Sequence, residues 1–141
     1  MRGRTLRAAL AGAAAAGAWA AAEPALRRAT GGYHSQARLI GGLVAPRGRW
    51  REAGIAVHVA NGALFGVAFG RLGLSGTGAG IAAAEAENAL LWPLTAVLDR
   101  LHPDVRAGAW PPMARNPHAF AQEVLGHAVF GAVLGGLVRR G

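Results

Sequence analysis

The sequence predicts an all-α fold: a polytopic membrane protein whose four transmembrane helices form two weakly similar helix pairs. Three observations predict this. Long apolar runs alternate with polar connections, small residues recur at every fourth position in two of the runs, and most of the basic residues lie outside the runs. The chain has 141 residues, which is enough for a single integral membrane domain over 1–141. Its hydrophobic content of 52% is carried mainly by alanine rather than by large side chains.

The apolar runs place the expected helices. Each run has about the 20 residues that a helix needs to cross the hydrocarbon core. The first run also fits a cleaved signal peptide, because three alanines precede Glu23, but we expect a retained helix. A short interfacial helix is expected within 33–44. The candidate spans are 6–23, 53–74, 78–98 and 119–138, and the polar connections are 27–52 and 99–117.

The third candidate span carries two carboxylates, Glu85 and Glu87. By analogy with other charged residues, each costs about 2.5 to 3.5 kcal/mol in the middle of a membrane helix, whereas a leucine returns only about 0.3 to 0.6 kcal/mol. This segment therefore needs partner helices, or protonated carboxyl groups, to stay inserted.

Two runs place small or polar residues four positions apart, so that these residues share one helix face. In the second span the series begins at Gly54 and His58, and in the fourth it begins at Glu123 and His127. Glycine faces of this kind let membrane helices pack closely, within one chain or between copies. The predicted packing residues are Gly62, Gly66, Gly70, Gly131 and Gly135.

An internal repeat relates the same two spans. The segment NGALFGVAFGRL at 61–72 matches GHAVFGAVLGGL at 126–137, so that Phe65 meets Phe130 and Gly66 meets Gly131. With one span between them, the two helices run in the same direction. The repeat therefore predicts a parallel duplication of two helices each.

Ionisable groups inside a bilayer usually face the interior of the bundle, and this makes them the candidate polar or proton-relay residues. Counted along the helices, His127 lies within reach of Glu87, whereas Glu85 lies too far from His58. His58 and Glu123 can pair across the two halves. Interhelical hydrogen bonding that fixes the packing is the alternative role. The candidates are His58, Glu85, Glu87, Asn88, Glu123 and His127.

No enzyme is predicted, and no catalytic residue is assigned. Cysteine is absent, and the sequence has no GxSxG, Walker loop, Rossmann fingerprint or HExxH motif. A metal site formed by His58, Glu123 and His127 is a weaker alternative, since only one Glu and His pair has helical spacing. We therefore expect neither a metal nor a cofactor.

A net charge of +8 also occurs in nucleic-acid-binding proteins. Here the basic residues, all arginines, lie at segment ends, where they reach anionic lipid headgroups. The expected partners are therefore the lipid bilayer, a second copy of the chain or another membrane protein, and not nucleic acid.

Arginine counts leave the orientation open. Four spans with the amino terminus inside place six arginines inside and nine outside, and the opposite orientation reverses these numbers. If the first apolar run turns back instead of crossing, the counts become twelve against three.

Two motifs, WAAAEP at 19–24 and HVANGALFGVAFG at 58–70, resemble the small YagU-like bacterial inner-membrane proteins. The resemblance covers the four-span layout, a glutamate that ends the first helix and a histidine near the start of the second. It implies a multi-pass protein of the bacterial cytoplasmic (inner) membrane without an established reaction. We expect a structural or accessory membrane protein that self-associates through its glycine faces. The alternative is a proton-coupled transporter or channel component that uses the intramembrane Glu and His residues.

Overall fold

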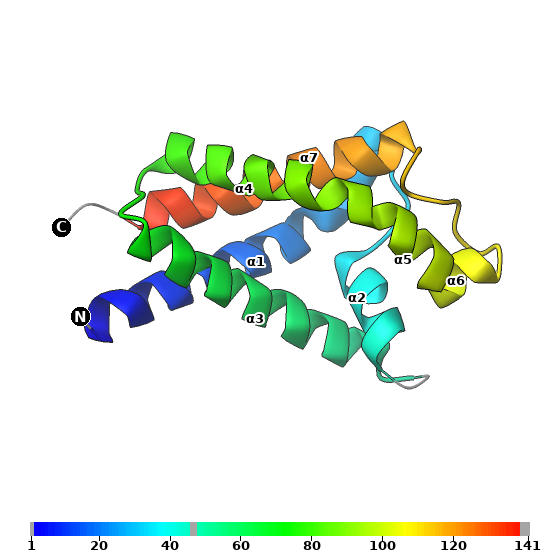
Figure 1. The fold of residues 1–141 in the computed structure, drawn as a ribbon, viewed down its shortest axis with the longest axis horizontal. Helices are drawn as coiled ribbons and strands as arrows, with labels where there is room; N and C mark the ends of the chain where they lie inside the picture. Colours follow the sequence, from blue (N-terminus) through cyan, green and yellow to red (C-terminus); the bar gives the residue numbers. More distant parts are fainter. Residues whose placement is uncertain (1, 46–47, 139–141) are drawn as a thin grey trace.

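The computed structural model describes residues 2–45 and 48–138, and these residues form helices and connections without a strand (Figure 1). The elements in chain order are α1 (Arg2–Thr30), α2 (Gln36–Val44), α3 (Trp50–Arg71), α4 (Thr77–Leu91), η1 (Trp92–Leu94), α5 (Thr95–Leu101), α6 (Pro103–Arg106) and α7 (Pro117–Leu137). The all-α prediction is confirmed.

Both termini lie at one end of the molecule, together with the turn between α3 and α4; we call this the terminal end (Figure 1). The opposite end, the loop end, holds α2, α5 and α6. The first helix runs from one end to the other and does not turn back (Figure 1).

α1 is longer than the expected span 6–23, and it includes the start of the predicted connection 27–52. Pro24 lies inside it on the exposed side and does not end it. The helix ends where Thr30 bonds back to the carbonyl of Leu26 and Gly31 takes a positive φ of 68°. α2 lies within the predicted 33–44, with Ser35 as its N-cap.

The expected third span 78–98 is not one regular helix. α4 has 15 residues and is about 22 Å long, which is shorter than the roughly 30 Å hydrocarbon core. The chain then passes through the 3₁₀ turn η1, in which Pro93 has no N–H to continue the α-helical ladder, and goes on as α5. Most of the predicted connection 99–117 is irregular, apart from the end of α5 and the single turn α6.

Two helices, α3 and α7, are long and apolar enough to cross a membrane, by length and composition alone. The prediction of membrane-crossing helices is thus confirmed in this coarser form, for two helices rather than four. α4, with 15 residues, is too short.

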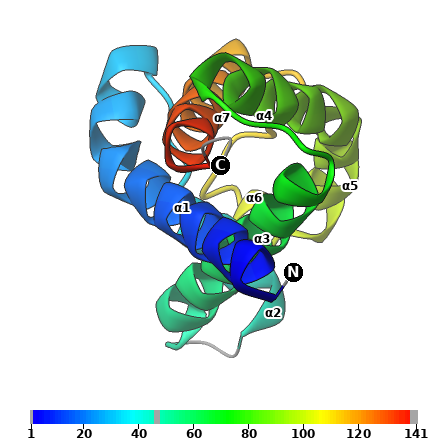
Figure 2. The same ribbon diagram turned by 90° about the vertical axis from the view of Figure 1, so that its left-hand side faces the viewer.

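α1 packs against both α3 and α7, and α7 packs against α4, as the end-on view shows (Figure 2). α2 packs against α3 at the loop end. In the described part of the chain, α3 and α4 share no comparable contact. The backbones of α3 and α4 are therefore not packed closely against each other, although Phe69 of α3 and Ala84 of α4 belong to one buried cluster.

The predicted packing glycines lie at two crossings inside the molecule. A methyl group at Gly66 would overlap the carbonyl oxygen of Ala8 in α1, and one at Gly131 would overlap that of Gly80 in α4. Gly62 and Gly135 likewise face α1 and the start of α4, whereas Gly70 meets only the Ala8 methyl group. The glycine faces are therefore occupied within the chain.

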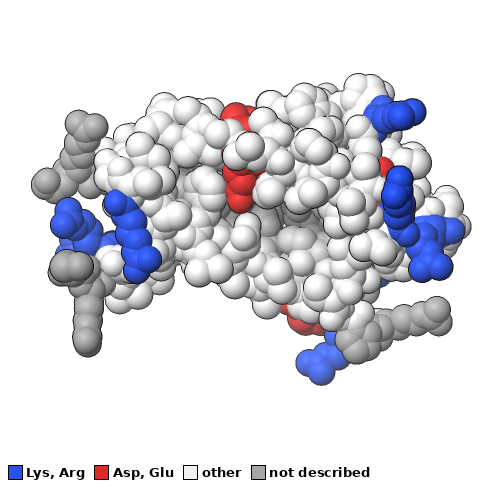
Figure 3. Space-filling view, viewed as in Figure 1, with Lys and Arg blue, Asp and Glu red and all other residues white. Residues whose placement is uncertain are grey.

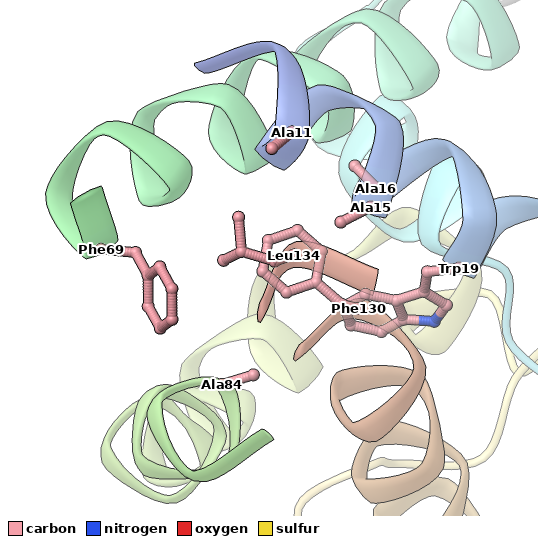
Figure 4. Packing of buried hydrophobic residues seen from close by; sticks show 8 residues of the cluster. All are labelled: Ala11, Ala15, Ala16, Trp19, Phe69, Ala84, Phe130 and Leu134. Carbon is pink, nitrogen blue, oxygen red and sulfur yellow. The ribbon is translucent and has the colours of Figure 1, made fainter. Parts of the chain in front are cut away.

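The hydrophobic core consists of alanines of α1 and α4 together with large side chains of α1, α3 and α7 (Figure 4). Ala15, Ala16 and Ala84 are completely buried, and Phe130 and Leu134 of α7 fill the space beside them. Phe65 and Phe130 also meet edge to face, with ring centroids 5.4 Å apart. Close backbone approach replaces bulky packing here.

The charged residues on the visible face follow the long axis of the molecule (Figure 3). Basic side chains gather at both ends, and a wide belt without basic residues separates them. Exposed leucines contribute to the surface of the helices, including Leu64 of α3 and Leu90 of α4, which are 70% and 78% exposed. Acidic side chains appear near the middle of this belt, over α4 (Figure 3).

Candidate functional site

A cavity of about 180 Å³ lies inside the bundle, and all the long helices contribute to its wall. Two wall residues, Asn61 of α3 and Leu91 of α4, are exposed, so the mouth lies where α3 and α4 separate. Figure 3 shows a recess near the middle of this face, beside the acidic side chains. We call this feature the polar cavity.

The structure brings most of the predicted polar residues to this wall. The predicted residues that line the polar cavity are His58, Glu87, Asn88, Glu123 and His127. Glu85 does not line it; its Oε2 accepts a hydrogen bond from Asn88 Nδ2 at 3.4 Å. In the described residues, no hydrogen bond or ion pair joins Glu85 to His58.

Glu123 is the most heavily bonded of these groups. Its Oε1 lies 2.6 Å from His34 Nε2 and also accepts a hydrogen bond from the side-chain amide of Gln36. Gln122, the next residue along α7, donates to the backbone carbonyl of His34 at 2.9 Å. The connection between α1 and α2 is therefore fixed to α7 by buried hydrogen bonds.

Glu23 ties the same connection to α1. Its Oε2 accepts a hydrogen bond from the backbone N–H of Gln36 at 2.7 Å. This bond satisfies a donor in the first turn of α2, which has no partner within its own helix. Glu23 and Glu123 thus have structural partners that hold one short segment between two helices.

His58 and His127 both contact the same tryptophan. The Trp19 ring lies 5.1 Å from the ring of His58 and 4.6 Å from that of His127, measured between centroids. His127 Nδ1 is 2.8 Å from the backbone carbonyl of Glu123, one turn earlier. In the described residues, His58 and Glu123 form no direct hydrogen bond, and His58 Nε2 is buried without a partner.

Glu87 differs from Glu123 and Glu23, the two carboxylates described above. It is half-buried, and no residue of the described chain hydrogen-bonds to it or forms an ion pair with it. Within the described residues, the polar cavity therefore contains one carboxyl group that accepts no hydrogen bond and forms no ion pair.

At the loop end a second set of contacts closes the bundle beyond the polar cavity. Arg38 of α2 makes a two-pronged ion pair with Asp104 of α6, with both N–O distances 2.6 Å, and lies 4.8 Å from the centre of the Trp50 ring. The hydrogen bond from Arg38 lowers the pKa of Asp104, and the same bond raises the pKa of Arg38. His102 stacks on Trp110 with centroids 4.9 Å apart.

Tyr33 joins this closure to the loop before α7. Its hydroxyl donates to the carbonyl of Pro111 at 2.7 Å. Burial, with a smaller contribution from the charge of Asp99, raises the pKa of Tyr33 to about 12. Tyr33 is therefore a neutral hydrogen-bond donor at physiological pH.

Buried polar side chains are confined to one half of the described bundle. They extend from the level of the polar cavity to the loop end, and include His34, Gln36 and His102. Toward the terminal end the interior is filled by the hydrophobic core and the glycine crossings. The polar cavity is therefore continuous with polar groups on one side only.

His34, Gln36 and Trp19 were not among the residues predicted from the sequence. For His34 and Gln36 the sequence offers one signal, which is their position beside a short amphipathic segment. Trp19 precedes Glu23 by one helical turn, which places the two on one face of α1. No group of three or more His, Asp or Glu residues is arranged to hold a metal ion within residues 2–45 and 48–138.

No family model matches this chain, and neither a curated protein nor a solved structure is significantly similar to it. The resemblance to the YagU-like proteins therefore stays a prediction.

Proposed function

We propose that this chain is a small multi-pass protein of the bacterial cytoplasmic membrane, and that its polar cavity takes part in proton-coupled transport. The observation that carries the proposal is the position of the polar cavity, whose wall includes Glu87, Glu123 and His127, between arginine-rich ends and inside an apolar belt. Glu and His side chains in such a place are typical of proton relays.

The belt supports insertion of the whole bundle. Exposed leucines face outward along α3 and α4, and the arginines at both ends are placed to reach anionic headgroups. α4 and α5 together provide a third apolar path from end to end, and α1 provides a fourth. This arrangement favours four crossings, with the charged ends at the two interfaces.

The one-sided polar interior favours alternating access over an open channel. The hydrophobic core seals the polar cavity from the terminal end, so a proton entering it has no polar route onward. Movement of the pair α1 and α3 against the pair α4 and α7 would open that route, because the two pairs meet mainly along α1 and α7.

Proton flux into liposomes tests this function. The purified chain, reconstituted with a trapped pH-sensitive dye, should pass protons down a gradient, and Glu87→Gln should reduce the rate several-fold. Glu85→Gln is the matched control, since it removes the neighbouring carboxylate of the same helix outside the polar cavity. Equal rates of proton flux in the wild type, Glu87→Gln and empty liposomes would contradict the transport function.

A non-catalytic accessory role is the second candidate, and the Glu123 network favours it. The carboxyls of Glu23 and Glu123 both hold the connection between α1 and α2 in place, which is a structural use. An accessory protein of this kind would contact other membrane proteins, or a second copy, through surfaces other than the glycine faces. Absence of flux, with variants changed only in stability, would support it.

A further inference from the structure

We propose that the polar cavity binds a small organic cation, an amine with a compact hydrocarbon body, whose ammonium group lies at Glu87. This inference rests on the site of the proposed function and names the class of ligand that the site takes. It is carried by the size of the cavity, its charge, its mixed wall and a buried nitrogen without a partner.

The size of the polar cavity limits the ligand. Its volume is about 180 Å³. An apolar cavity of about 150 Å³ accommodates benzene. A ligand of about six to eight non-hydrogen atoms therefore fits, and a larger metabolite does not.

The charge of the wall selects a monovalent cation. Glu123 is compensated by His34 and Gln36, whereas Glu87 has no hydrogen-bond or ion-pair partner in the described chain. One uncompensated carboxylate in a largely apolar enclosure favours one positive charge. Since the described residues provide no cluster able to hold a metal ion, an organic cation fits better than a metal.

The wall has both an apolar and a polar part. Trp92, Phe130 and Leu98 contribute hydrocarbon and aromatic surface, which suits an apolar body and attracts an adjacent cation. Asn88 and His58 supply polar atoms to the same wall. A ligand with a hydrocarbon body and a single ammonium group matches both parts.

His58 supplies the independent observation. It is only 8% exposed and lines the polar cavity, yet its Nε2 has no hydrogen-bond partner. Buried polar atoms in folded proteins are normally satisfied, so an atom of this kind beside a cavity indicates a ligand or water. The mouth between Asn61 and Leu91 gives access from the apolar belt, a route that suits an amine with a hydrocarbon body.

Isothermal titration calorimetry on the purified full chain in detergent tests the inference with a matched ligand pair. Benzylamine is an ammonium ion at neutral pH, and benzyl alcohol has the same size and no charge. We expect benzylamine to bind at least about tenfold more tightly, which is the ratio that one charge-assisted hydrogen bond gives. Empty micelles measure the partitioning of each ligand.

Two variants locate the site. Glu87→Gln should abolish the preference for benzylamine, whereas Glu85→Gln should keep it, because Glu85 lies outside the polar cavity. Equal affinities for the two ligands in the wild type, or no binding of either, would overturn the inference. Loss of the preference in Glu85→Gln as well would also overturn it, and the ligand comparison in the wild type remains decisive if Glu87→Gln does not fold.

Binding and flux separate this inference from the proposed function. Selective benzylamine binding without proton flux would support the cation site and contradict the transport role. Proton flux without selective benzylamine binding would support the transport role and contradict the cation site.

Discussion

Gly131 illustrates how single residues set the spacing of this bundle. It lies at the crossing of α7 and α4, where a methyl group would overlap the backbone of Gly80 and Ile81. Backbone atoms cannot rotate away as a side chain does, so the whole helix would have to move. Gly17, on the exposed face of α1, has nothing within 4 Å of the same position.

Gly131→Ala should therefore destabilise the fold by about 1 to 3 kcal/mol, the usual range for overpacking. Gly17→Ala should leave stability unchanged or raise it by up to about 1 kcal/mol, because alanine is the better helix former. Thermal unfolding of both variants in detergent measures this. A Gly131→Ala variant as stable as the wild type would contradict the close backbone contact between α7 and α4 at this position.

At the scale of elements, α2 and α6 form a closure over the loop end through Arg38 and Asp104. The ion pair is partly exposed, so solvent screens it and its contribution stays at or below about 1 kcal/mol. Its role is to hold α2, which carries Gln36 into the Glu123 network, against the end of the bundle.

This pair predicts a pH dependence with a definite sign. The pKa of Asp104 is lower in the folded chain than its ordinary value of 3.8, because Arg38 donates to its carboxylate. The stabilisation is therefore present above about pH 4 and is lost as the pH falls through the lower, folded-state value. Unfolding midpoints of the wild type and Asp104→Asn should differ at pH 6 and converge in acid; a constant difference would contradict the assignment.

At the scale of the molecule, both termini and the α3–α4 turn share one end, and the connections around α2 and α6 share the other (Figure 1). Within the described chain, α3 and α7 have the length and hydropathy to cross a membrane, and the proposed four crossings also require α1 and the path through α4 and α5. In the proposed arrangement arginines lie at both interfaces, so their counts do not decide the orientation.

Cysteine labelling tests this topology, since the chain has no native cysteine. Single substitutions at Arg49 and Ala109, both exposed at the loop end, should react with an impermeant maleimide from one side of the membrane. Arg4→Cys and Leu72→Cys should react from the other side. Release of the chain by alkaline carbonate without detergent, or labelling of all four positions from one side, would contradict membrane crossing.

The sequence anticipated part of the candidate site. Helical spacing and depth predicted Glu87 near His127, and both line the polar cavity, because the argument uses only the fixed rise of a helix. It did not anticipate His34, which reaches Glu123 across 89 positions of sequence. Nor did it anticipate Trp19, which contacts both histidines, because contacts between distant segments leave no local period.

The sequence by itself determined the helical fold, the approximate helix bounds and the glycine faces, since these depend on composition and on the periodicity of neighbouring residues. Only the tertiary structure decided that the glycine faces meet α1 and α4 of the same chain, and that α3 and α4 stay apart. It also decided which carboxylates receive partners. Glu23 and Glu123 are satisfied by the short connection folded between them, while Glu87 lines the polar cavity without a hydrogen bond from the described residues. Such choices depend on the packing of segments far apart in the chain, which no local pattern specifies.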